Sequence, residues 1–112
     1  MMAIELIGNK KNVKPINNDN LVNTELYNLI TPEIYSTRYS LNIMNILPNG
    51  FVKTQSHKEE HGVFIISGKG NILLGEEWFD VRKGSYVFIP SGMVHSFKNS
   101  GIEPMEVLIL KI

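Results

Sequence analysis

The chain has 112 residues, a length that suits one domain with its own hydrophobic core. Lys and Arg together number 11, as do Asp and Glu, and no basic run occurs, so nucleic acid and anionic membranes are not expected partners. No apolar run is long enough to span a bilayer, and the N-terminus lacks the basic region of a secretory signal. Cysteine is absent, which excludes disulfides and thiolate ligands; we expect a cytoplasmic protein.

The first half of the chain begins with an irregular segment and then turns to strand patterns. Residues 9–20 are rich in Asn and Lys around Pro15, which predicts an N-terminal arm over residues 1–20. The apolar residues of the segment 21–30 fit either a short helix or a strand, because periodicity cannot decide at this length. Alternation from Tyr39 to Ile46 predicts a strand that ends at Pro48-Asn49-Gly50.

The second half consists of short β-rich runs separated by glycine-containing turns such as Pro90-Ser91-Gly92. The runs cover residues 51–57, 63–67, 71–74, 78–81, 86–89, 94–98 and 105–112. Many short strands at close spacing predict an all-β sandwich or barrel, with residues 21–112 as a single domain. We expect four aromatic residues in the core rather than in contact with a substrate: Phe64, Trp78, Phe88 and Phe97.

All three histidines lie in two polar clusters. Gln55 and His57 are two residues apart on a predicted strand, so their side chains point to the same face. The next strand pairs back and brings His61 level with His57, while His95 stands at the head of a later strand. Three imidazoles and an amide oxygen would form most of a first coordination shell for a divalent metal. A lone histidine, however, is more often a surface or hydrogen-bonded residue than a ligand.

The later cluster carries a motif with specific spacing. Gly84, Pro90, Gly92, His95 and Asn99 follow the pattern of a Gly, five residues, Pro-x-Gly, two residues, His, three residues and Asn. This segment resembles the second conserved motif of the cupin superfamily, without a departure.

The earlier cluster keeps the spacing of the first cupin motif but changes three residue types. His57 and Gly68 match, whereas Asn49 stands in the first Gly slot, Gln55 in the first His slot and His61 in the Glu slot. The Glu-to-His change is similar to a subgroup of compact cupins in which four histidines hold a metal. The resemblance covers roughly residues 38–112.

The resemblance implies a jelly-roll β-barrel, the double-stranded β-helix, with His57, His61 and His95 as metal ligands and Gln55 as a weaker fourth. The metal implied is a divalent transition ion, Mn, Fe, Ni, Cu or Zn, and a homodimer is the usual assembly. Because no carboxylate belongs to this ligand set, the ion would keep its double charge and favour an anionic or enolisable small molecule.

The candidate proton-transfer groups are few, because no fourth histidine exists. Glu59, Glu60 or solvent at the metal would carry protons, although the two glutamates are most simply a charged corner, and Glu60 could instead orient His61. We therefore expect a small-molecule metalloenzyme of oxygenase, isomerase or lyase type. The alternatives are a non-catalytic module that binds a sugar or other small molecule, and a structural dimerisation domain in which the histidines are incidental.

Overall fold

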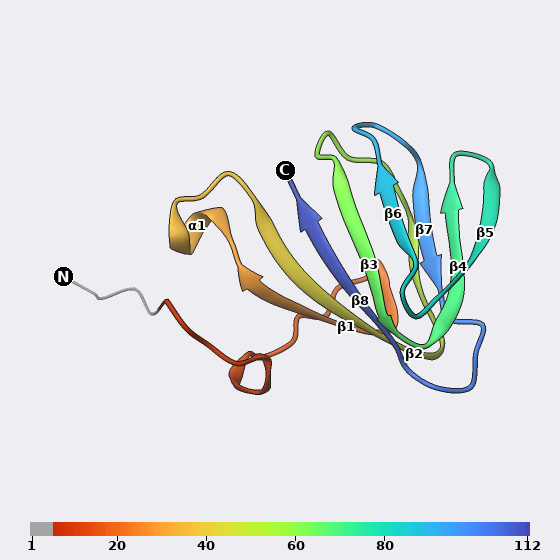
Figure 1. Ribbon diagram of the computed structural model, residues 1–112, viewed down its shortest axis with the longest axis horizontal. Coiled ribbons are helices and arrows are strands. Elements are labelled where there is room, and N and C mark those ends of the chain that lie inside the picture. Colours follow the sequence, from red (N-terminus) through yellow and green to blue (C-terminus); the bar gives the residue numbers. More distant parts are fainter. Residues whose placement is uncertain (1–5) are drawn as a thin grey trace.

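The computed structural model describes residues 6–112 (Figure 1), so Met1–Glu5 of the predicted arm lie outside the described residues. Two short helices, η1 (Lys10–Asn12) and α1 (Pro32–Tyr35), precede most of the sheet. The strands are β1 (Leu21–Ile30), β2 (Ser40–Gln55), β3 (His61–Ser67), β4 (Lys69–Leu74), β5 (Glu77–Arg82), β6 (Tyr86–Ile89), β7 (His95–Lys98) and β8 (Met105–Lys111). The segment 21–30, left open by its periodicity, is a strand.

The strands form one curled antiparallel sheet, in the order β5-β4-β7-β2-β8-β3-β6, with β1 paired to the outside of this path on β2. The curl places β4, β5 and β7 opposite β8 and β3, so that two layers enclose a core (Figure 1). This architecture confirms the all-β jelly-roll prediction, and the predicted runs from residue 63 onward fall on observed strands.

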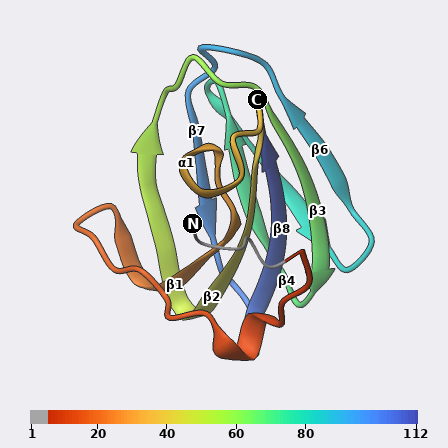
Figure 2. The ribbon, with the colours of Figure 1, turned by 90° about the vertical axis from the view of Figure 1, so that its left-hand side faces the viewer.

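The strand predicted to end at Pro48-Asn49-Gly50 does not end there. β2 continues to Gln55 and changes partner at this point: Ser40–Ile46 pair with β8, whereas Phe51–Gln55 pair with β7. Figure 2 shows the two limbs of β2 separating on either side of the bend. The prediction was wrong because Pro and a left-handed Asn49, at φ 67°, bend a strand without ending it when each limb has a partner of its own.

Two asparagines hold this bend. The Asn23 side chain donates a hydrogen bond to the Pro48 carbonyl at 2.9 Å. Asn99, only 2% exposed, donates its amide to the Ile46 carbonyl at 2.8 Å, and its backbone N–H donates to the Gly50 carbonyl at 3.0 Å. The strictly spaced Asn of the second motif is therefore a structural tie between the last loop and the bend.

The core is built from the alternate residues of each strand that point inward. Most of them are β-branched residues, which suit a pleated surface. The largest fully buried side chains are Ile46, Ile65, Ile72, Ile89, Met105, Val52 and Val107. In β3, His61 shares the inward parity of Val63 and Ile65. The inward row of the sheet thus turns from apolar to polar at one end of the barrel.

The prediction for the aromatic residues was correct for one of four. Phe97 is 3% exposed, but Trp78, Phe64 and Phe88 are 52%, 44% and 60% exposed. Alternation identifies which residues share a face of a strand, but it does not say which face is covered. The three exposed rings stand on outward positions of β3, β5 and β6.

The described part of the arm contacts its own chain. Lys10 forms an ion pair with Glu106 of β8, 3.0 Å between Nζ and Oε2, and lies over the ring of Tyr27. Ile16 forms a bridge with Leu26. A contact of the arm with a partner stays a prediction. Within residues 6–112, no helix is long and apolar enough to cross a membrane.

We predict that Gly50→Ala destabilises the protein, because a Cβ at this position would lie 2.4 Å from the Asn23 carbonyl oxygen and 2.8 Å from that of Leu47. Overpacking of this kind costs about 1–3 kcal/mol, which chemical denaturation would measure. Gly62→Ala is the matched control, since nothing lies within 4 Å of the added atom. Equal stability of both variants would show that the bend is not tightly packed.

Candidate metal centre

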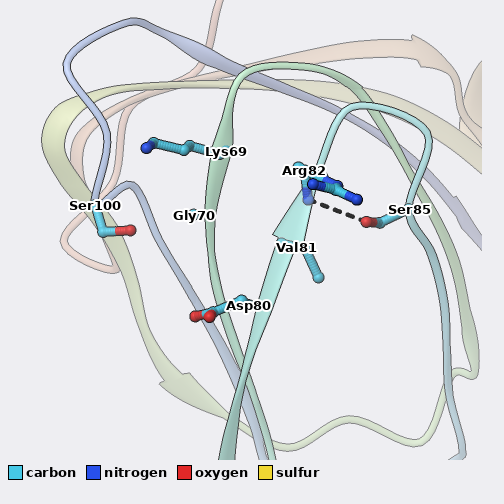
Figure 3. A pocket seen from close by; sticks show the side chains of 7 residues that line it. All are labelled: Lys69, Gly70, Asp80, Val81, Arg82, Ser85 and Ser100. Atoms are coloured by element: carbon cyan, nitrogen blue, oxygen red, sulfur yellow. Dashed lines mark hydrogen bonds between the residues drawn. The ribbon is translucent and has the colours of Figure 1, made fainter.

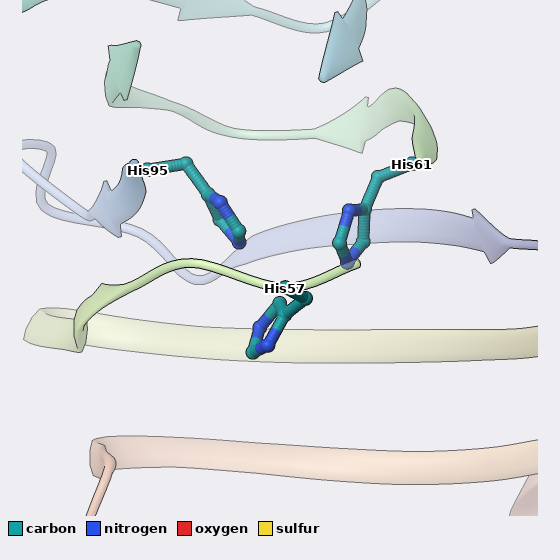
Figure 4. A group of neighbouring side chains, drawn as sticks. All are labelled: His57, His61 and His95. Atoms are coloured by element: carbon teal, nitrogen blue, oxygen red, sulfur yellow. The ribbon is translucent and has the colours of Figure 1, made fainter. Parts of the chain in front are cut away.

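Three separate segments bring the histidines together. His57 follows the end of β2, His61 opens β3 and His95 opens β7. Their ring centroids lie 5.5 Å (His57–His61), 5.1 Å (His57–His95) and 5.0 Å (His61–His95) apart. One nitrogen from each ring can be chosen so that all three lie within 4.8 Å of one another. Figure 4 shows the imidazoles converging on a common space.

The hydrogen bonds of the His61 and His95 rings leave a nitrogen of each ring available to bind a metal ion. His61 and His95 are 4% and 3% exposed. The His95 Nδ1 lies 2.9 Å from the Met93 carbonyl oxygen, which only accepts, so Nδ1 carries the proton and Nε2 is left with a free lone pair. The His61 Nδ1 is buried without a hydrogen-bond partner among the described residues. An orphaned buried nitrogen costs free energy until a ligand, ion or water satisfies it.

Burial and neighbouring charge favour the neutral form of two rings, His57 and His61. Burial first, and then the charges of His95 and Lys111, lower the pKa of His61 to about 4. The pKa of His57 is also lowered, mainly by burial and then by His95. Neutral imidazoles are the form that binds metal, so these two rings are ready to coordinate at neutral pH.

The donor set suits a first-row transition ion. Three nitrogens bound tetrahedrally at the usual Zn–N distance would lie about 3.4 Å apart, so small rotations of the rings would bring them onto one ion. Imidazole ligands suit Zn, Cu, Fe and Ni. No carboxylate belongs to the cluster in the described chain, which agrees with an ion that keeps its full charge.

Gln55 stands beside this cluster. It is the direct partner of His95 in the β2–β7 pairing and lines the same cavity of about 190 Å³ as the three histidines. The structure therefore places the amide near the rings, and its role as fourth ligand stays a prediction.

Two further residues of this cavity escaped the sequence reasoning, Asn42 and Lys111. The sequence carries a signal for both, since each lies on the same face of its strand as buried residues. Asn42 is spaced by two from Met44 and by four from Ile46, and Lys111 is spaced by two from Ile109. A polar residue at an inward position is informative because burying it without a partner is costly.

The arm also contributes to the cavity wall, through Asn18 and Asn20. The Asn20 carbonyl accepts a hydrogen bond from the Lys53 backbone N–H at 2.8 Å, which attaches this wall to β2. Composition alone had suggested only an irregular segment here, because the contact depends on the fold.

The two glutamates of the corner lie at the edge of the site. The pKa of Glu59 is lowered, first by a hydrogen bond to its own backbone and to a smaller extent by His57. Glu59 is therefore a carboxylate at neutral pH, able to accept a proton. Glu60 pairs through its backbone with Ile112, with N···O distances of 3.0 and 3.1 Å.

A larger hollow of about 510 Å³ lies away from the histidines. Figure 3 shows that its polar side chains point in different directions, Lys69 and Asp80 to one side and Arg82 to the other. Asp80 already accepts a hydrogen bond from Asn71. We place the candidate site at the smaller cavity, because three imidazoles of the described chain converge there.

Comparison with known proteins identifies relatives of part of the chain. An uncharacterized protein of Methanocaldococcus jannaschii is 34% identical over 83 residues, 71% of this chain and 66% of that protein. The mannose-1-phosphate guanylyltransferase of Klebsiella pneumoniae is 32% identical over 77 residues, 67% of this chain; these residues are 16% of that enzyme, so the chain spans only a small part of its length.

Among solved structures, a predicted oxalate decarboxylase from Thermotoga maritima superposes with a TM-score of 0.85 at 21% identity, over 96% of this chain and 98% of that one. This likeness shows the shared fold. Residues 42–111 match the family described as the cupin domain. Since the match spans more than half of the chain, the protein belongs to the cupin domain family.

Proposed function

We propose that the protein is a metal-dependent cupin that acts on a small anionic or enolisable molecule. The observation that carries this proposal is the convergence of three imidazoles from three segments, two of them buried and none in an ion pair with a carboxylate of residues 6–112. Buried clusters of this kind are costly unless something occupies the space between them. His57, His61 and His95 would hold the metal, and Gln55 would be the fourth, weaker ligand.

The chemistry supplied by a bound divalent ion would be that of a Lewis acid for an oxygen of the substrate. The protein would contribute a cavity with neutral ligands, so the positive charge would remain to attract an anion. Glu59 is the better candidate of the two glutamates for accepting a proton, because its carboxylate interacts electrostatically with His57 and His61.

The names of the relatives do not select a reaction. A guanylyltransferase and a predicted oxalate decarboxylase differ in chemistry, and one fold hosts many reactions. An oxygenase, isomerase or lyase remains the proposed class. A second candidate function, a non-catalytic binding module for a sugar or another small molecule, is favoured by Gln55, since an amide in a histidine slot would weaken metal retention.

We also propose that the protein is a homodimer formed through the outer face of β3, β6 and β8. The exposed side chains of this face are apolar or aromatic, with Phe64, Tyr86, Phe88 and Leu110 between 40% and 83% exposed. They are neighbours, since Phe64 pairs with Tyr86, and Gly62 with both Phe88 and Leu110. An uncharged face offers nothing for a charged partner, and two copies related by a two-fold axis would cover each other.

For the metal site, we predict that His57→Ala and His95→Ala each abolish metal retention while the fold persists, because each removes one of three imidazoles. Elemental analysis of untagged protein would measure the metal, and thermal unfolding the fold. Gln55→His should raise metal affinity by completing four imidazoles. Metal content that is unchanged in both alanine variants would contradict the site.

For pH, we predict that the metal-free protein loses stability as the pH falls from 7 to 5. His61 has a folded pKa of about 4 against an ordinary value of 6.5, so the unfolded chain takes up the proton first. The loss is about 2 kcal/mol over this range, measured by denaturant unfolding at each pH. His61→Gln should show a smaller loss, and an identical loss in both proteins would refute the cause given.

For assembly, we predict that Phe88→Lys converts a dimer into a monomer. Burying an unpaired ammonium costs at least about 3 kcal/mol, or more than a hundredfold in the dimer dissociation constant. Light scattering after size-exclusion chromatography would measure the mass. Trp78→Lys is the control, because Trp78 is similarly exposed but lies on β5, outside the proposed face. If Phe88→Lys remained a dimer and Trp78→Lys did not, the interface would lie at β5 and not at the proposed face.

A further inference from the structure

Lys111 occupies an unusual place for a charged residue. It is the direct partner of His61 in the β3–β8 pairing and of Ser40 in the β2–β8 pairing, so its side chain points to the same side of the sheet as the His61 imidazole. It also lines the cavity that holds the three histidines. Its charge is one of the smaller influences that lower the pKa of both His57 and His61, after burial and His95, which places the ammonium near the rings.

Lys111 forms no ion pair at contact distance within the described residues, although its charge is one of the smaller influences that lower the pKa of the Glu59 carboxyl. The ion pair found among residues 6–112 joins Lys10 to Glu106, and no carboxylate of the described chain pairs with Lys111. Lys111 is half-buried beside two imidazoles, so negative charge on a ligand in the cavity would stabilise its ammonium.

Asn42 supplies an independent second observation. It is 3% exposed and lines the same cavity. It lies on β2, next to the strand that carries Lys111: Asn42 pairs with Ile109 of β8, two residues before Lys111, which pairs with Ser40. Its amide nitrogen donates to the Asn28 Oδ1, but its own Oδ1 is buried and has no hydrogen-bond partner in the described part of the chain. Such an acceptor costs about 1–3 kcal/mol when left unsatisfied, so a donor on a ligand would restore the balance.

We propose that Lys111 and Asn42 form a recognition subsite in which the ammonium binds a carboxylate of the ligand and the Asn42 Oδ1 accepts a hydrogen bond from a hydroxyl or amino group of the same molecule. The subsite deepens the proposed function by naming the ligand class, a small hydroxy or amino carboxylate. It rests on that function only for the part of the ligand that would face the metal.

The size of the cavity limits the ligand. About 190 Å³ corresponds to roughly six water molecules at liquid density, which is below the volume of sites for drug-sized ligands. A molecule of lactate size, with one carboxylate and one hydroxyl, carries both groups that the subsite would recognise. Lactate is therefore a suitable probe, whatever the natural ligand is.

The test compares lactate with two molecules of nearly the same shape, lactamide, which lacks the charge, and propionate, which lacks the hydroxyl. Dissociation constants are measured at constant ionic strength from backbone amide NMR shifts, for metal-free and Zn²⁺-loaded protein. The wild type should prefer lactate over lactamide by at least about tenfold in both forms. Lys111→Met, which keeps the length of the side chain, should lose this preference in the metal-free protein and most of it in the loaded protein.

Lys98→Met is the matched control. It also removes one positive charge, but Lys98 is an exposed residue of β7, next to Phe51 and Asn71 and outside the cavity. This variant should keep the full preference for lactate. If Lys111→Met keeps it as well, or if Lys98→Met loses as much, the proposed role of Lys111 is overturned.

For Asn42, the relevant ratio is lactate against propionate. Asn42→Leu should lower this ratio by about threefold to tenfold, with thermal unfolding as the check on the fold. If Asn42→Leu does not fold, the same ratio is measured with Asn42→Ala, whose side chain is smaller. A ratio equal to that of the wild type would place the hydroxyl elsewhere and overturn the role of Asn42.

The two proposals fail in different ways. A protein that takes up no Zn²⁺ but prefers lactate through Lys111 in the metal-free form supports the subsite and contradicts the metal-dependent function. A protein that retains Zn²⁺ but binds lactate and lactamide equally supports the metal centre and contradicts the subsite.

Discussion

The bend of β2 is the constraint on which the rest of the structure depends. One continuous strand pairs with β8 before the bend and with β7 after it, so a single segment belongs to both layers of the barrel. The buried Asn99 side chain and the Asn23 amide satisfy the Ile46 and Pro48 carbonyls just before Gly50, where regular pairing is interrupted. Because β2 bridges the layers, the residues that follow it reach the space between β3 and β7, where His61 and His95 stand.

At the end of the barrel that holds the histidines, the inward residues change from apolar to polar. Toward the middle of the barrel, inward positions hold Val, Ile and Met, whereas the last inward positions of β3 and β8 are His61 and Lys111. Burial, and to a smaller extent the charge of His95, lower the pKa of His57 and His61, while Lys111 forms no ion pair at contact distance within the described residues. The cavity therefore places neutral imidazole nitrogens beside the positive charge of Lys111. Both features favour an anion among its guests, whether or not a reaction follows.

The outer surface of the sheet has a part that the arm covers and a part that is exposed. The arm lies over β1 and β8, with Lys10 held by Glu106 and by the ring of Tyr27. Beyond β8 the aromatic side chains of β3 and β6 are exposed. A second copy of the chain would bury them without disturbing the mouth, since inward and outward residues alternate along each strand. The proposed assembly and the proposed ligand site would thus use opposite faces of the same strands.

The sequence by itself determined the strands from residue 63 onward, the turns between them and the choice of the three histidines as candidate ligands, because alternation, glycine turns and motif spacing are local patterns. Gln55 beside His95 was also foreseeable from the motif. Only the tertiary structure decided that β2 bends rather than ends, that Phe64 and Phe88 face outward, and that Lys111 and Asn42 face the cavity. The physical reason is that covering a face, and pairing one strand with another distant in sequence, depend on which segments meet in space, and a period of two residues is the same on both faces of a sheet.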